Sequence, residues 1–390
     1  MARTRSRAAQ QKSAAETSAP PKKAATRKAA EKKPPAAAEA APEATFTVPD
    51  DLDVPGSEAG SEAGAGSGTS TETGTGAAPG SAAAGVPGRR GRLGVRKTYK
   101  LYLGGGFPRS ESGRTYEVRD AAGAFLANAA MASRKDARDA VVAARAAQPG
   151  WAGATAYNRG QVLYRVAELM EGRHAQFTDE VAAAEGLSRE ASAAVVDAAI
   201  DRWVWYAGWT DKIAQVAGAA NPVAGPYFNM SVPEPTGVVA VLAPQGSSLL
   251  GLVSVIAPVI AGGNAAVVLT SQARPLPAVT LTEVLATSDV PGGVVNILTG
   301  VTAEVAGWLA SHEDVDALDL AGAAGADGVD WGELESAAAG TLTRVVRPAG
   351  SGSAADTDGA VEPDWAAPPD GPKRILAFQE TKTIWHPKGR

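Results

Sequence analysis

The sequence has 390 residues and not one cysteine. This absence excludes a thiolate nucleophile, a disulfide and a thiolate-ligated metal ion. Histidine is scarce as well, and no two of the three copies, His174, His312 and His386, have the four-residue spacing that would place them together on a helix. We therefore expect no metal site, and any catalysis would have to use other side chains.

Long apolar runs are also missing. The longest candidate, Leu249 to Ile260, ends at Ala-Gly-Gly-Asn and is shorter than the roughly 20 apolar residues that a membrane-spanning helix needs. The first residues, Met-Ala-Arg-Thr-Arg-Ser-Arg, are followed by no apolar signal core. We therefore expect a cytoplasmic protein that does not contact a membrane.

Large apolar side chains are sparse in the first hundred residues. Residues 1–33 carry ten Lys or Arg against Glu16 and Glu31, and residues 49–91 are rich in Gly, Ser, Thr, Ala and Glu. Such compositions bury too little surface to fold, so we expect residues 1–96 to be a disordered extension. An alternative function for residues 1–33 is a tether to nucleic acid through counterion release, although they lack interleaved aromatic residues.

From Lys97 to Val346 the apolar residues are regularly spaced, which predicts one large folded domain. Ser133 and Asp136 have the spacing of a helix capping box. A strand is expected before this helix, with Tyr99, Leu101 and Leu103 alternating along it. Three more helices are expected after it, over residues 158–174, 176–185 and 188–216.

After residue 237 the pattern alternates between strand and helix. Apolar strands are expected over residues 238–242, 265–269, 294–298, 315–320 and 341–346, and helices between them over 249–261, 278–286, 303–310 and 331–338. Five apolar strands separated by helices imply a parallel sheet covered on both faces. The predicted fold class is α/β, a doubly wound sheet of the kind that binds nucleotides.

The composition changes again near the end of the chain. Residues 347–372 are rich in Gly, Ala, Ser, Asp and Pro, which predicts a flexible linker. Within residues 373–390, the sequence from Ile375 to Trp385 has the β-branched and aromatic character of a strand. A strand so isolated needs a sheet to join.

Two smaller clusters have simple structural interpretations. We interpret the three tryptophans of one predicted helix as packing or interface residues, namely Trp203, Trp205 and Trp209. We expect three acids around one predicted strand to cap and flank it, namely Asp314, Asp316 and Asp319.

Several segments, in the same order along the chain, resemble the aldehyde dehydrogenase family. The most specific are Glu234-Pro-Thr-Gly-Val-Val, Ala257-Pro-Val-Ile-Ala-Gly-Gly-Asn and Pro291-Gly-Gly-Val-Val-Asn-Ile-Leu-Thr-Gly. Phe378-Gln-Glu-Thr-Lys-Thr-Ile-Trp resembles the oligomerisation strand that ends family chains. The resemblance implies the family's cofactor domain with N-terminal helices and oligomerisation strands, and it implies that the catalytic domain is missing between Val346 and this strand.

The resemblance also implies that the catalytic groups are gone. Family members use a cysteine nucleophile, an asparagine that donates to the oxyanion and a glutamate that activates water. In Pro244-Gln-Gly-Ser-Ser, Gly246 stands at the position of the asparagine, and Arg347 stands at that of the glutamate. With no cysteine present, we expect no catalytic residue and a catalytically inactive chain.

The resemblance places the contacts to NAD or NADP at six positions: Pro244, Gln245, Gly246, Thr270, Gly322 and Ala323. Thr270 and Ala273 replace a Lys and a Glu that hold the adenosine ribose, and Ala323 replaces a Ser that binds the pyrophosphate. With these side chains replaced, we expect dinucleotide binding to be weak or lost. Some binding could persist, because backbone N–H groups at a helix N-terminus can still receive a phosphate. In the simplest interpretation, Gly322, Gly325 and Gly328 are turn glycines.

Loss of a catalytic domain would expose a face of the cofactor domain and a strand edge, which stable proteins cover. Our first hypothesis is therefore an inactive subunit that assembles with a complete aldehyde dehydrogenase or with itself. The linker would let the terminal strand reach a neighbouring subunit. Two alternatives remain: residual aldehyde oxidoreductase activity in a site shared with a partner chain, and an adaptor tethered to nucleic acid through residues 1–33.

Overall fold

The computed structural model describes residues 97–352 and 360–388. The predicted disordered extension over residues 1–96, the proposed tether at 1–33 and part of the predicted linker lie outside these ranges. No helix in the described ranges is long and apolar enough to cross a membrane.

A five-stranded parallel sheet forms the centre of the structure, as the sequence predicts. Its order is β10-β9-β6-β7-β8, and every neighbouring pair is parallel. The bounds are β6 Val238–Leu242, β7 Ala265–Leu269, β8 Val295–Leu298, β9 Ala317–Asp319 and β10 Arg344–Val346.

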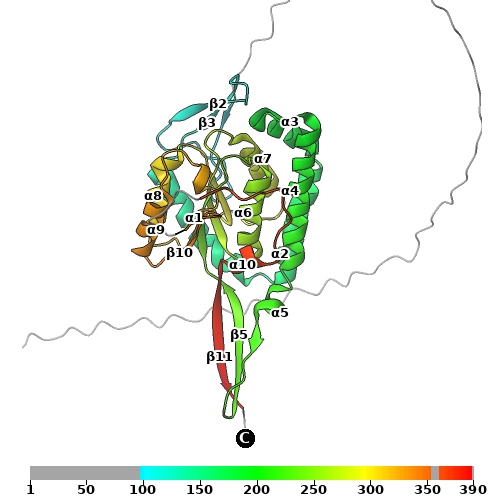
Figure 1. Ribbon diagram of the computed structural model, residues 1–390, viewed down its shortest axis with the longest axis vertical. Coiled ribbons are helices and arrows are strands. Elements are labelled where there is room, and N and C mark those ends of the chain that lie inside the picture. The colour runs from blue at the N-terminus through cyan, green and yellow to red at the C-terminus, as the bar shows by residue number, and fades with distance from the viewer. Residues whose placement is uncertain (1–96, 353–359, 389–390) are drawn as a thin grey trace, which may run out of the picture. The chain divides into compact units, whose positions relative to one another are not determined.

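Helices cover both faces of this sheet (Figure 1). Alternation along β6 explains how: Val239 and Val241 point into one core cluster, and Val238 and Ala240 point into the other. The first cluster is completed by α2 Ala156–Glu171, α4 Arg189–Trp209, α6 Leu250–Ala261 and α7 Leu276–Leu285, and the second by α1 Arg134–Gly153, α8 Thr302–Ala310 and α9 Trp331–Ala339.

Strand order creates a reversal beside β6. The chain runs from β6 outward through β7 to β8 and then returns to the other side of β6 as β9. The loops that follow the carboxyl ends of β6 and β9 therefore lead to opposite faces of the sheet. In open α/β sheets, ligands bind in the crevice between two such loops.

The helices before the sheet follow the prediction except at one break. The capping box at the start of α1 is confirmed, because Ser133 Oγ accepts from Asp136 N and Asp136 Oδ2 accepts from Ser133 N. The single helix expected over residues 188–216 is instead α4 and the short α5 Ile213–Ala217. The Thr210 hydroxyl donates to the Ala207 carbonyl at 2.9 Å, and such side-chain bonds compete with helix continuation. The helix α3, His174–Glu185, lies where it was expected.

A small sheet precedes α1, and its form differs from the prediction. Only Thr98–Tyr99 (β1) of the expected strand enters it, beside β3 Phe125–Ala130, which also pairs with β2 Thr115–Arg119. Tyr102 instead bridges to Ile297 of β8. Gly104 and Gly105 both have a positive φ, which allows the tight antiparallel bridge between Leu103 and Gly106. The chain reverses its direction there.

The terminal strand β11, Gln379–Pro387, pairs antiparallel over all nine residues with β5, Tyr227–Pro235. β5 also pairs with the short β4, Ala219–Ala220. The expectation that the terminal strand lacks a sheet in its own chain is therefore wrong. We name β4, β5 and β11 together the arm, which runs away from the parallel sheet (Figure 1).

Part of the predicted linker is packed against the domain. Trp365 is 9% exposed and belongs to the first core cluster, and Arg202 of α4 donates to the carbonyls of Trp365 and Ala367. The short helix α10, Lys373–Leu376, follows and buries Ile375 completely. A buried aromatic side chain and the hydrogen bonds from Arg202 thus anchor a stretch whose composition is typical of a linker.

Candidate functional site

The crevice between the carboxyl ends of β6 and β9 collects the residues that the sequence singles out. Gly322, after β9, lies against the loop after β6: a Cβ at this position would stand 2.3 Å from the carbonyl carbon of Ala243 and 2.5 Å from the nitrogen of Pro244. Glycine is required here because no side chain fits between the two backbones. The structure therefore brings Pro244 and Gly322 together.

The end of β7 joins the same crevice. Ser271 Oγ donates to the Gln245 carbonyl at 3.0 Å, and Gln272 N donates to Gln245 Oε1 at 3.0 Å. Thr270 itself is 2% exposed, and its hydroxyl contacts the carbonyls of Ser271 and Leu298 at 3.4 Å. Thr270 thus packs beneath the crevice and does not face it.

Ala323 begins the 3₁₀ helix η1, Ala323–Gly325, and is 2% exposed. Its methyl group belongs to the second core cluster. Of the six predicted contacts to a dinucleotide, Gln245 and Gly246 are the two that are not buried. Whether any of the six binds a cofactor remains a prediction.

A carboxylate from the far end of the chain fills the crevice, and no local sequence pattern predicts it. Glu362 Oε1 accepts from the backbone N–H of Gln245 at 2.6 Å and from that of Gly246 at 3.4 Å. A Cβ added at Gly325 would stand 2.6 Å from the same oxygen. Glu362 therefore lies between the loop after β6 and the loop after β9.

A second acid occupies the start of α6. Both the backbone N–H and the hydroxyl of Ser248 donate to Glu185 Oε1, at 2.7 and 2.6 Å, and Gly251 N donates to Ser247 Oγ at 2.9 Å. The N-terminus of a helix favours negative charge, which explains why Glu185 lies there. The backbone N–H groups of Ser248 and Gly251 thus already have acceptors from this chain.

An ion pair behind the crevice fixes the segment that carries Glu362. Asp319 at the end of β9 is fully buried and accepts from Arg374 and, at 3.0 Å, from the N–H of Ala321. Burial raises the pKa of Asp319, and the charge of Arg374 opposes that rise. The Arg374 guanidinium also stands 5.8 Å from the centre of the Trp365 ring.

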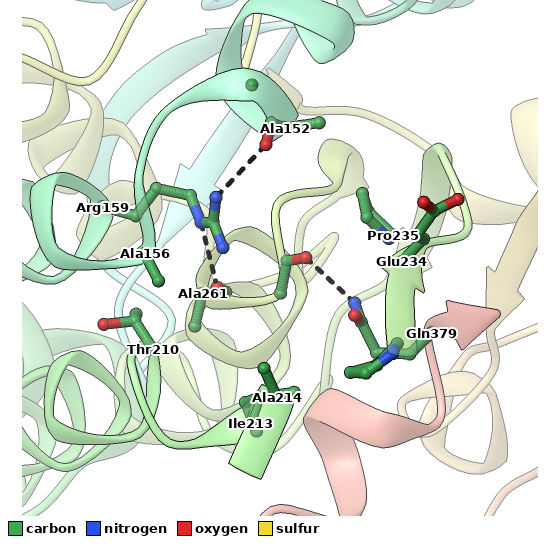
Figure 2. A pocket seen from close by; sticks show the side chains of 13 residues that line it. Ala152, Ala156, Arg159, Thr210, Ile213, Ala214, Glu234, Pro235, Ala261 and Gln379 are labelled. Atoms are coloured by element: carbon green, nitrogen blue, oxygen red, sulfur yellow. Dashed lines mark hydrogen bonds between the residues drawn. The ribbon is translucent and has the colours of Figure 1, made fainter. Parts of the chain in front are cut away.

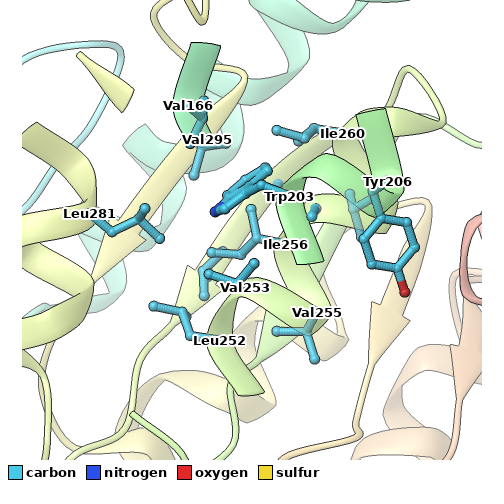
Figure 3. Close-up of a cluster of buried hydrophobic side chains, with 14 of the residues drawn as sticks. Val166, Trp203, Tyr206, Leu252, Val253, Val255, Ile256, Ile260, Leu281 and Val295 are labelled. Carbon is cyan, nitrogen blue, oxygen red and sulfur yellow. The ribbon is translucent and has the colours of Figure 1, made fainter. Parts of the chain in front are cut away.

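The acids near this strand have unequal roles. Asp316 Oδ2 accepts from the N–H of Val238 at 2.7 Å and from Arg145 at 2.6 Å, so it flanks the strand as expected. Asp319 differs because it is a buried partner of Arg374. Among the tryptophans, Trp203 is buried in the core (Figure 3), whereas Trp205 is 39% exposed.

A cavity of about 470 Å³ lies at the base of the arm (Figure 2). Arg159 lines it and donates to the carbonyls of Ala152, Ala154 and Ala261. Burial lowers the pKa of Arg159. These carbonyls hold the guanidinium in place, and the cavity is separate from the crevice.

The residues of the crevice do not fit a bound dinucleotide in this conformation. The N–H groups of Gln245 and Gly246 are taken by Glu362, Ala323 has no hydroxyl for a phosphate, and Thr270 is turned inward. In the ranges that the structure describes, no group of three or more His, Asp or Glu side chains could hold a metal ion.

Comparison with known proteins gives a consistent result. The sequence model of the aldehyde dehydrogenase family matches residues 107–352. Cytosolic 10-formyltetrahydrofolate dehydrogenase of Mus musculus is 32% identical over 243 residues, which are 59% of this chain and 26% of that protein. Putative aldehyde dehydrogenase DhaS of Bacillus subtilis (strain 168) is 33% identical over 236 residues, which are 58% of this chain and 46% of that protein.

Solved structures share the fold. The NAD⁺ complex of aldehyde dehydrogenase from Bacillus cereus superposes with a TM-score of 0.59 at 26% identity, covering 64% of this chain and 50% of that one. The chain thus spans between about a quarter and about half of the length of these proteins, from 26% of the mouse protein to 50% of the Bacillus cereus one.

Proposed function

The chain belongs to the aldehyde dehydrogenase family, and on that premise we propose that it is a catalytically inactive subunit that assembles with a complete aldehyde dehydrogenase or with a second copy of itself. At the level of the family, the membership supports an NAD(P)-dependent oxidoreductase. What we propose beyond this family-level statement is that this chain is inactive and that it assembles with another chain.

The chemistry of this chain supports inactivity. It has no cysteine to supply a thiolate, and a neutral hydroxyl without an adjacent base attacks a carbonyl poorly. Gly246 has no side chain to donate to an oxyanion. Arg347, at the position that the resemblance gives to the general base, pairs with Glu335 and cannot accept a proton.

The arm is the observation that carries the assembly proposal. Large apolar side chains are exposed on it: Phe228 is 50% exposed, Ile384 40% and Trp385 59%. The register places Met230 opposite Ile384 on one face and Asn229 opposite Trp385 on the other, so both faces are partly apolar. Exposed apolar side chains gathered in this way are typical of interaction surfaces.

β11 also presents an open edge. It is the outer strand of the arm, and no strand in the described ranges pairs with its far side. An unpaired edge of nine residues offers backbone N–H and C=O groups to another strand. Assembly through this edge would cover both the backbone groups and the exposed aromatic side chains.

Co-expression of the tagged chain with a full-length aldehyde dehydrogenase tests the proposal. Size-exclusion chromatography with light scattering should show a complex, or a homo-oligomer of the chain alone. The double substitution Trp385→Ser with Ile384→Ser should raise the Kd of this assembly by about tenfold or more, since apolar anchors dominate interfaces. Tyr157→Ser is the matched control, because Tyr157 is 65% exposed on α2 and belongs to none of the strands of the arm.

Two results would contradict the proposal. The first is a chain that stays monomeric alone and never co-elutes with the complete enzyme. The second is aldehyde oxidation with stoichiometric NAD(P) reduction by the purified chain, which would remove the claim of inactivity while leaving the assembly claim to be judged by size.

A further inference from the structure

The crevice beside β6 has the features of a built anion site. Two backbone N–H groups, those of Gln245 and Gly246, converge on one carboxylate oxygen of Glu362. Consecutive N–H groups that point to one place form a concavity for anions. The position is also the reversal point of the sheet, where this fold class binds its ligands.

The acid that fills the site is anchored on both sides. Val361 donates its N–H to the Ala349 carbonyl at 2.9 Å, which pairs the segment with the chain that leaves β10. Three residues after Glu362, Trp365 is buried and Arg202 donates to its carbonyl at 2.9 Å. Contacts that flank Glu362 in this way place its carboxylate in the crevice as part of the fold.

Tethering makes this acid a strong competitor for the site. A group joined to the same chain acts at an effective concentration on the order of millimolar, without the loss of translational freedom that a free anion suffers. A free anion must displace Glu362 before it can accept from the two N–H groups.

We propose that the crevice is an anion-binding site whose ligand is Glu362 of the same chain, so that residues 360–367 close the site against phosphate groups, including the pyrophosphate of a dinucleotide. The inference does not rest on assembly through the arm.

Calorimetric titration of the full chain with inorganic pyrophosphate, and separately with NAD⁺, tests this proposal. We expect Glu362→Ala to lower the Kd for pyrophosphate by about tenfold or more relative to the unaltered chain. Glu304→Ala is the matched control, since Glu304 is an exposed acid of α8 that pairs with Arg114. Tighter binding of pyrophosphate but not of NAD⁺ would limit the site to free phosphates, and tighter binding of both would extend it to the dinucleotide.

Equal pyrophosphate affinity in the unaltered chain and in Glu362→Ala, including no binding to either, would overturn the proposal. A second measurement does not depend on a ligand: amide hydrogen exchange at Gln245 and Gly246 should accelerate in Glu362→Ala and stay unchanged in Glu304→Ala. Exchange that is already unprotected in the unaltered chain would also overturn it. If Glu362→Ala does not fold, Glu362→Gln removes the charge, keeps the volume and is expected to shift both measurements in the same direction.

Discussion

Single residues decide how closely the two loops of the crevice approach. Gly322 touches the backbone after β6 so tightly that any side chain would overlap it. The sequence marks Gly322 as a turn glycine, and the structure shows that its value lies in contact with a distant loop as well. Local patterns identify such residues, but they do not say what the residue touches.

We expect Gly322→Ala to destabilise the fold by about 1–3 kcal/mol or more, because its Cβ would meet rigid backbone atoms at 2.3 Å. The measurement is the free energy of unfolding in urea. Gly208→Ala is the control: Gly208 lies inside α4 with nothing within 4 Å of its added Cβ, and alanine there should stabilise the helix by about 0.5–1 kcal/mol. Similar effects of the two changes would disprove the close approach.

The difference between local and distant contacts explains which contacts the sequence predicts. Ser133 and Asp136 are recognisable because the capping box needs only their spacing. Glu362 contacts an N–H group 117 residues earlier in the chain, and its surroundings are typical of a linker. A contact of that range depends on tertiary structure, so no local pattern reveals it.

Among the elements, the buried strands were the easiest to predict. β6 and β7 are continuous apolar runs between turn residues, and the structure has the same bounds as the prediction. β5 was missed although Phe228, Met230 and Val232 alternate with Asn229 and Ser231 along it. These apolar side chains are exposed or half-buried, so the strand has no buried apolar face. Its partner β11 was predicted as a strand, but its place beside β5 was not.

Helix α4 allows a test at this scale, because its tryptophans have different environments. Trp203 is fully buried among Val166, Ile256 and Ile260 (Figure 3), whereas Trp205 is 39% exposed and stacks edge-on with Trp209. We expect Trp203→Ala to cost about 3–5 kcal/mol of unfolding free energy. Trp205→Ala should cost less than about 1 kcal/mol, and equal losses would show that the helix packs through a different face.

On the scale of the whole molecule, the described part of the chain is a family cofactor domain against which its own C-terminal stretch packs, at α4 and at the end of β9. Composition predicts a linker over residues 347–372, and the sequence could not show that Trp365 and Arg374 dock this stretch against α4 and β9. The proposed assembly therefore concerns the arm, where apolar side chains stay exposed.

Length changes test how independent this stretch is from the domain. An insertion of about ten Gly and Ser residues between Pro368 and Pro369, in the stretch that joins Trp365 to α10, should change the free energy of unfolding by less than about 1 kcal/mol, since loop closure depends weakly on length. The same insertion before Ile375, which is fully buried in α10, should destabilise the protein by several times as much. Large destabilisation by both would contradict this separation.

The last strand of the parallel sheet and the first residues of β11 are held side by side. Arg344 of β10 donates to the carbonyl of Ala377 at 3.1 Å and to that of Gln379 at 2.7 Å, where β11 begins. The polypeptide thus leaves the parallel sheet and re-enters the arm at adjacent positions. Because the two ends of the intervening stretch are adjacent, a change in its length does not by itself require the sheet and the arm to move apart.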